Sequence, residues 1–316
     1  MQKRMLLIGT FAALVGVAGA AYGAEEFPSR PIQVVIPFQP GDTDNMLRPF
    51  LDRMGDVLGQ PVVLNYRPGA GGAIGAGEVA ASDPDGYTLV GTSPGSVVVA
   101  PLANPQARHA LDDFIPVASL AEGGIIIVVQ AGSPWSDFDE FVGDARQRPG
   151  EITFGTSGTN GITHLATEAL GMRADFELTH IPYQGSGPAI AALLGGEIDM
   201  STSAIGPAAP HIREGTLVPL AVMAEGRLDA YPDVPTVREL GYDFGAPLLY
   251  GILAPSGTPE SVVSKLATAA ETVVSNQSEE IAEILSQLDA QINFLPPDDY
   301  AAYLNEQNAI FSTAME

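Results

Sequence analysis

The chain has 316 residues, no cysteine and a formal net charge of −24 at neutral pH. This length is enough for two domains with a sizeable core. The lack of cysteine excludes disulfides, thiolate metal sites and a cysteine nucleophile. Lys3 and Lys265 are the only lysines, and the arginines do not cluster. A groove for nucleic acid needs clustered basic side chains, so no nucleic-acid partner is expected.

The first 23 residues have the three parts of a secretory signal peptide. Lys3 and Arg4 precede an apolar segment, 5–17, and small residues then permit cleavage after Ala20 or Gly23. The alternative is a membrane anchor, but the apolar segment is shorter than the roughly 20 residues that span a bilayer. We therefore expect residues 1–23 to be a signal peptide and the protein to work in the periplasm.

The first element after this leader is a strand that turns sharply into a helix. Ile32–Ile36 is a short, β-branched apolar run that predicts a buried strand. Gly41 permits a tight turn, and Thr43 or Asp44 can cap a helix that ends at Gly59. A helix start at such a turn aims free N–H groups at an anion. The alternative is an ordinary connection within an α/β domain.

The remaining pattern alternates strands with helices, which predicts parallel sheets covered on both faces. The apolar run 124–130 should be a strand buried on both faces. The strand, proline and helix at 248–275 resemble those at 128–141, which suggests two similarly built lobes. Further strands are expected at 61–66, 87–91, 114–120, 152–154, 180–183, 198–203, 217–223 and 293–295, and helices at 73–81, 133–146, 162–172, 189–194, 279–288 and 298–311.

Three enzyme motifs are incomplete in this chain. The glycines at 71–77 fit a dinucleotide loop, but the Tyr-x-x-x-Lys pair of short-chain dehydrogenases is missing, because residue 261, four before Lys265, is serine. Neither a Walker loop nor a G-x-S-x-G elbow occurs. His164 and His180 lack partners at metal-binding spacing, so contact with a ligand or packing is expected for both. The sequence therefore predicts no catalytic residue, cofactor or metal.

Loops rich in Ser, Thr, Asn and Gly directly precede several predicted helices. Such loops offer N–H groups and hydroxyls that can hold a carboxylate without chemistry following. The alternative for each loop alone is plain helix capping. Together, in an exported chain with two lobes, they favour a receptor for a solute. The loops are 41–44, 92–96, 155–161, 185–187 and 201–203.

Short motifs along nearly the whole mature chain resemble one family. The chain is similar to the periplasmic substrate-binding proteins of tripartite tricarboxylate transporters, the Bug-type receptors. The resemblance implies an α/β fold with two lobes like a type II periplasmic binding protein, each lobe a mostly parallel sheet flanked by helices, with the ligand cleft between them. Lobe 1 should hold 24–121 and 226–316, and lobe 2 should hold 122–225. The motifs are 27–32, 37–41, 58–63, 65–72, 83–89, 180–186, 233–236 and 250–259.

In this family the loops matching Phe38 to Asp44 and Thr156 to Asn160 grip one ligand carboxylate, largely through backbone groups and water. The resemblance implies a small organic acid as ligand (a dicarboxylate, tricarboxylate, amino acid or aromatic acid), permease subunits as partners, and a monomer. The expected ligand-binding residues are Phe38, Gly41, Asp42, Thr43, Asp44, Thr92, Ser93, Thr156, Ser157, Thr159, Asn160, His164, Tyr183, Ser186 and Ser203.

Asp42 stands where the family usually has a second glycine. A carboxylate beside an anion pocket repels the ligand. Asp42 therefore either points away from the cleft or recognises a cationic group on a zwitterionic or neutral ligand. Two other functions stay open beside transport: the same fold as a sensor for a membrane histidine kinase, and an exported enzyme acting on a carboxylated substrate.

Overall fold

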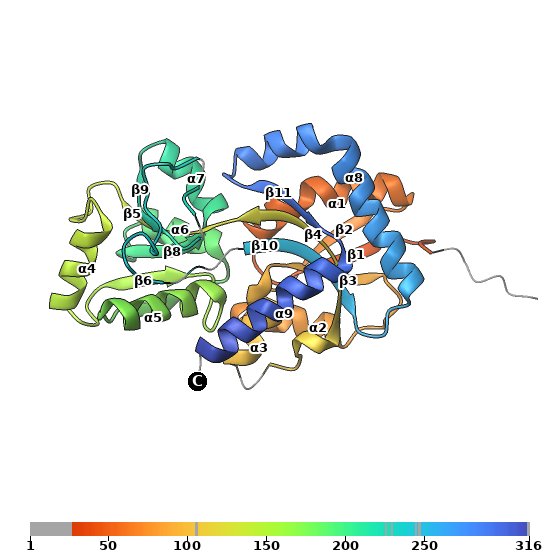
Figure 1. Ribbon diagram of the computed structural model, residues 1–316, viewed down its shortest axis with the longest axis horizontal. Helices are drawn as coiled ribbons and strands as arrows, with labels where there is room; N and C mark the ends of the chain where they lie inside the picture. The colour runs from red at the N-terminus through yellow and green to blue at the C-terminus, as the bar shows by residue number, and fades with distance from the viewer. Residues whose placement is uncertain are drawn as a thin grey trace, which may run out of the picture.

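The computed structural model describes residues 27–104, 107–224, 226–228, 230–243, 245 and 248–314. These residues form two lobes that lie side by side, each built on its own sheet (Figure 1). The expected signal peptide, 1–23, lies outside the described residues. Within the described ranges, no helix has both the length and the apolar character needed to cross a membrane.

Lobe 1 is built on a six-stranded sheet with the order β11-β4-β10-β3-β1-β2. Helices α1 and α8 pack together on one face, and α2, α3 and α9 lie on the other (Figure 1). The strands are β1 (Ile32–Ile36), β2 (Val62–Tyr66), β3 (Thr88–Thr92), β4 (Phe114–Gly123), β10 (Leu248–Pro255) and β11 (Gln291–Leu295). The helices are α1 (Thr43–Leu58), α2 (Ala73–Ala80), α3 (Ala100–Ala103), α8 (Glu260–Ser286) and α9 (Pro297–Ala314).

Lobe 2 is built on a five-stranded sheet with the order β7-β6-β8-β5-β9. Helices α6 and α7 cover one face and α5 covers the other (Figure 1). The strands are β5 (Ile125–Gln130), β6 (Thr153–Thr156), β7 (Thr179–Pro182), β8 (Met200–Ala204) and β9 (Leu217–Val222). The helices are α4 (Phe138–Gln147), α5 (Ile162–Ala174), α6 (Ser186–Leu194) and α7 (Ile205–Arg213).

The expected two-lobed α/β architecture is confirmed, but both sheets are mixed rather than simply parallel. In lobe 1, β1 to β4 share one direction, and β10 and β11 run against them. In lobe 2, only β5 opposes its neighbours. For β5 and β10 the reason is the crossing of the chain between the lobes, whereas β11 follows α8 within lobe 1. β5 and β10 enter their sheets at the boundary between the lobes and run away from it, whereas the strands beside them run toward it.

Strand β5 is buried on both faces. All five residues from Ile125 to Val129 have no exposed surface, which confirms the prediction for this run; β5 lies between β8 and β9.

Helix α4 begins later than expected because the Asp137 side chain accepts the Glu140 N–H at 2.9 Å and so fixes the helix start. The boundaries expected between the lobes, 121/122 and 225/226, stay a prediction.

Candidate functional site

A hollow lies between the lobes, where several strands end and several helices begin. Its volume is about 20 Å³, which is room for about one water molecule. A dicarboxylate is several times larger, so the lobes must separate to admit one. The lining residues come from both lobes: Phe38, Gln39, Asp42, Thr43, Ser93, Ser157, Ile162, Thr163, Ser186, Ala204 and Leu248.

Four helices begin at this hollow, and none of them has a side-chain cap. The residues before α1, α5, α6 and α7 are Asp42, Gly161, Gly185 and Ala204, and none of these side chains accepts from its helix start. α4 begins elsewhere and is capped by Asp137, but α2, α3 and α8 also lack a side-chain cap, so what sets these four helices apart is that their starts meet at one hollow. Each uncapped start carries a partial positive charge and N–H groups without an intrahelical partner. Their convergence makes the hollow suitable for an anion.

Hydroxyl groups complete the lining. Ser157 donates its N–H to Thr163 Oγ1 at 3.2 Å, and the two hydroxyls are 3.0 Å apart. Ser186 Oγ accepts the N–H of Ala204 at 3.3 Å. Thr43 and Ser93 are 2% and 5% exposed, so their hydroxyls face a nearly dry space. Buried hydroxyls that can rotate supply further hydrogen bonds to a ligand oxygen.

Asp42 lines the hollow with a carboxylate. Its Oδ2 accepts the hydroxyl of Tyr250 on β10 at 2.9 Å. Its Oδ1 is buried and finds no hydrogen-bond partner among the described residues. Burial raises the pKa of Asp42 to about 7; the Tyr250 bond opposes this and the nearby Asp44 adds to it. Asp42 is therefore protonated far more readily than an exposed aspartate.

Six expected site residues line this hollow: Phe38, Asp42, Thr43, Ser93, Ser157 and Ser186. Two more, Thr159 and Tyr183, line a neighbouring hollow of about 140 Å³ between the Gly69–Gly71 turn and Ser157. That second hollow also lies between the lobes. The residues that line these two hollows belong to the main loops of both lobes, so these loops surround one cleft.

Four expected residues instead bond to their own surroundings. Asp44 Oδ1 accepts the Gly41 N–H at 2.6 Å, and Oδ2 accepts the Tyr66 hydroxyl at 2.9 Å. Thr92, Thr156 and Ser203 are fully buried and bond to neighbours within their own lobe. Gly41 lies in the turn itself, with φ +148°. Their role is to shape the loops rather than to line the hollow.

His164 and His180 lie behind the loop 156–161 of lobe 2. Their rings stack with centroids 3.8 Å apart. His164 Nδ1 accepts the Asn160 N–H at 3.2 Å, and His180 Nε2 lies 2.7 Å from Thr156 Oγ1. Burial lowers the pKa of His164. Burial, and then the neighbouring His164, lower the pKa of His180 to about 4. The pair is therefore neutral at pH 7 and holds the loop from behind.

The lobes are joined across the cleft by backbone and side-chain hydrogen bonds. Gln39 donates its N–H to Gln184 O at 2.9 Å. Asn160 Nδ2 donates to Ala103 O at 3.1 Å, with Asn160 at φ +58°. Because each bond joins lobe 1 to lobe 2, this arrangement is a closed one.

A latch between α7 and the end of α8 adds to these contacts. Arg213, in the last turn of α7, donates to Gln287 O at 2.6 Å, Ser286 O at 3.3 Å and Asp289 Oδ1 at 2.8 Å. These acceptors lie at the end of α8, where the helix dipole also favours a cation. Tyr231 donates to the other oxygen of Asp289. We define the latch as Arg213 with its acceptors at 286–289.

We expect Arg213→Ala to weaken ligand binding about tenfold, because the charge-assisted bonds that join the two lobes in this closed arrangement are lost. Titration calorimetry measures this change. Arg146→Ala is the matched control, since Arg146 donates to Ala174 O inside lobe 2. Equal affinities for the two variants would show that the latch does not favour closure.

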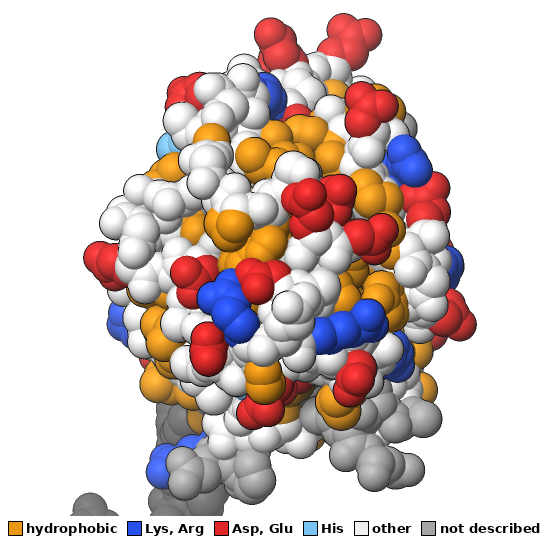
Figure 2. All heavy atoms as spheres, turned by 90° about the vertical axis from the view of Figure 1, so that its left-hand side faces the viewer, with side chains coloured by type: hydrophobic (Ala, Val, Ile, Leu, Met, Phe, Trp, Pro, Cys, Tyr) orange, Lys and Arg blue, Asp and Glu red, His pale blue; other side chains and the backbone are white. Residues whose placement is uncertain are grey.

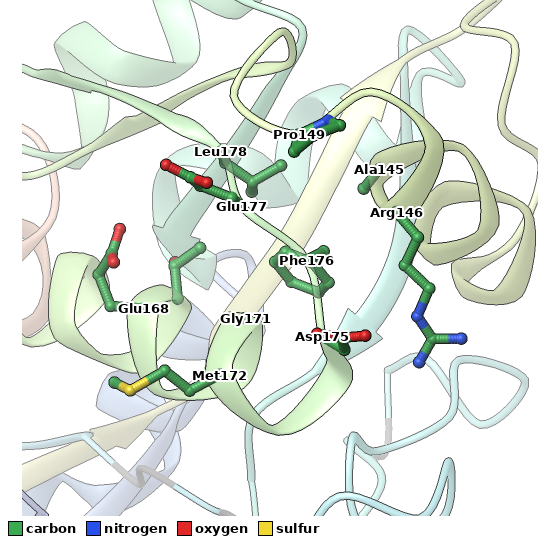
Figure 3. Close-up of a pocket in the computed structure, with 11 residues that line it drawn as sticks. Ala145, Arg146, Pro149, Glu168, Gly171, Met172, Asp175, Phe176, Glu177 and Leu178 are labelled. Carbon is green, nitrogen blue, oxygen red and sulfur yellow. The ribbon is translucent and has the colours of Figure 1, made fainter.

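Other hollows lie outside the cleft. One of about 550 Å³ lies beside the end of α5, and no expected site residue lines it (Figure 3). Glu168, Asp175 and Glu177 are around it, and carboxylates disfavour an anionic ligand. Acidic side chains are also spread over the end of lobe 2 (Figure 2). In the described part of the chain, no cluster of three or more His, Asp or Glu residues could hold a metal.

Sequence reasoning missed five lining residues. Gln39, Ile162 and Thr163 adjoin expected residues, so widening each loop by one or two positions would have found them. Ala204 and Leu248 carry no polar signal. Tyr250 holds Asp42 without lining the hollow, and it looks like any aromatic residue of a buried strand. Their places depend on how the two lobes meet.

Two lobes around a cleft with uncapped helix starts define the class of periplasmic solute-binding receptors. Comparisons with known proteins agree. The profile of the tripartite tricarboxylate transporter family receptor matches residues 46–312. The chain belongs to this receptor family.

Individual relatives support the Bug type within the family. BugT of Bordetella pertussis is 33% identical over 311 residues, which cover 97% of this chain and 94% of BugT. MatC of Rhodopseudomonas palustris, solved with bound malate, is 31% identical with a TM-score of 0.86, covering 92% of this chain and 100% of MatC. Another R. palustris protein, solved with adipate, is 27% identical with a TM-score of 0.85, covering 92% and 97%.

Proposed function

We propose that this protein binds a small carboxylate in the cleft, closes over it, and delivers it to the permease of a tripartite tricarboxylate-type transporter. The observation that carries the proposal is the meeting of four uncapped helix starts at one hollow. Together they hold a negative charge by dipoles and N–H donors, and no lysine or arginine is among the described residues that line the hollow.

The ligands of two structural relatives support this proposal. Malate and adipate occupy two structural relatives, and both are dicarboxylates. We infer that residues 1–23 direct export to the periplasm and that the receptor works as a monomer. We propose that Ser157, Thr163 and Ser186 form hydrogen bonds to the ligand carboxylate.

The function is tested by titration calorimetry of the mature protein with mono-, di- and tricarboxylates. We expect saturable binding of one ligand per chain, with the acid recovered unchanged by mass spectrometry. Turnover of the acid would favour the exported enzyme. Genes for permease subunits beside this one, rather than for a sensor kinase, would separate transport from sensing.

We expect Ser157→Ala to weaken binding of the best acid about tenfold or more, because a hydrogen bond to a charged group contributes roughly 1.5–3 kcal/mol. Calorimetry gives the ratio of dissociation constants. Ser136→Ala is the control, since Ser136 bonds to Glu140 outside the cleft. An unchanged affinity of the Ser157 variant would remove this residue from the site.

A further inference from the structure

Among the described residues, Asp42 is the one acidic side chain that lines the hollow, and its two oxygens have different surroundings. Oδ2 is held by the Tyr250 hydroxyl at 2.9 Å. Oδ1 is buried without a hydrogen-bond partner among the described residues. A buried polar atom left without a partner is destabilising, and more so when it is charged. Such an atom in a binding cleft indicates that something else supplies the missing donor.

Oδ1 lies at the boundary between the lobes. A Cβ added to Gly206, in the first turn of α7, would lie 3.4 Å from Oδ1. Asp42 belongs to lobe 1 and Gly206 to lobe 2, so separation of the lobes exposes this oxygen to an incoming ligand. Closure then buries it together with whatever the ligand places beside it.

The groups around Asp42 do not neutralise it. Asp44 on α1 adds negative charge, and Arg48 on α1 pairs with Asp44 at 3.6 Å. Tyr66 on β2 donates to Asp44. Tyr250 on β10 donates to Asp42 Oδ2, and Tyr303 on α9 lies beyond it. From α7 the facing residue is Gly206, which carries no side chain. Within the described residues, no cation forms an ion pair with Asp42.

We propose that Asp42 selects a zwitterionic ligand, receiving the ammonium group of an amino acid on Oδ1 while the helix starts hold its carboxylate. This inference rests on the proposed function. A hydroxyl donor would satisfy Oδ1 but leave the buried negative charge uncompensated. An ammonium group supplies both the donor and the charge. An acid without an amine would instead bring a second negative charge toward a buried carboxylate.

Proton exchange on binding tests the proposal in the unmodified protein. Calorimetry at pH 7 in two buffers of different ionisation enthalpy measures the protons exchanged per ligand. The pKa of Asp42 is about 7 with the lobes closed and no ligand. An ammonium ligand lowers this pKa, so binding releases protons from the fraction of Asp42 that is protonated. An acid without an amine raises that pKa and takes up a proton. The two outcomes differ in sign.

The probes are two matched pairs: aspartate with succinate, and glutamate with glutarate. In at least one pair we expect the amino acid to bind about tenfold more tightly or better, with proton release. Asp42→Asn should reduce that ratio to near one and abolish the release. Asp56→Asn, an exposed acid on the same helix, is the control and should change neither.

Three results would overturn the proposal. These are proton uptake with the tightest ligand, equal or tighter binding of the acids without an amine, and an unchanged ratio in Asp42→Asn. If only carboxylates without an ammonium group bind, the zwitterion inference fails while the proposed receptor function stands. If no carboxylate of any kind binds, the receptor function itself fails.

Discussion

Gly71→Ala is expected to weaken ligand binding by about a hundredfold while leaving each lobe folded. A Cβ at this position would lie 2.7 Å from Thr159 O and 2.9 Å from Gly161 N. Both atoms belong to the backbone of the lobe 2 loop, which cannot move aside as a flexible side chain would. The added methyl group therefore holds the lobes apart, and the bonds that form only on closure are lost. Titration calorimetry measures the affinity, and small-angle scattering measures the separation of the lobes.

Gly59→Ala is the matched control for this variant. Gly59 has φ +70°, close to the +63° of Gly71, so both substitutions carry a similar backbone cost of about 1–2 kcal/mol. A Cβ at Gly59 would meet nothing within 4 Å. The two variants should therefore lose similar thermal stability, and only Gly71→Ala should lose affinity. If both keep their affinity, close approach at Gly71 is not required for binding.

The second large effect is a loss of stability in acid caused by the stacked histidines. The pKa of His164 is lowered and that of His180 falls to about 4, both chiefly through burial. The unfolded chain therefore binds these protons first, near pH 6.5. The stability that the neutral pair contributes is complete above pH 6.5 and is lost as the pH falls toward 4. We expect this pair to account for about 1–2 kcal/mol after allowance for partial exposure.

Urea unfolding at pH 7.5 and pH 5 measures this effect. The difference in unfolding free energy between the two values should shrink in His180→Gln. It should not shrink in His211→Gln, whose ring lies at the end of α7 beside Glu214. Protonation also removes the acceptor for the Asn160 N–H, so the loop in front of the pair should loosen in the same pH range. An unchanged pH dependence in His180→Gln would contradict the prediction.

Local chemistry made much of this architecture predictable. The apolar run of β5 could belong only to a buried element, and the turn at Gly41 between Ile36 and Thr43 followed from its prolines and glycine. The mixed direction of the sheets was not predictable in the same way, because it depends on where the chain crosses from one lobe to the other. That crossing is an arrangement of distant segments, which a local pattern does not encode.

The site shows the same division. The loops were found because polar residues before helix starts carry a local signal. Which side chain faces the hollow depends on the pleat: Thr92 ends β3 and points inward, whereas Ser93, one residue later, lines the cleft. The orientation of Asp42 depends on Tyr250, which is 208 residues away in the sequence. No spacing rule connects two such residues.

The small volume of the hollow has a kinetic consequence. With the lobes in this arrangement the hollow at the helix starts is too small for an organic acid, so binding there must wait for an opening motion. Uptake then has a speed limit set by the protein itself: as solute becomes abundant, the observed association rate levels off at the frequency of opening instead of rising in proportion. Dissociation of the ligand depends on the same opening motion. A membrane partner that separates the lobes would therefore speed release of the ligand.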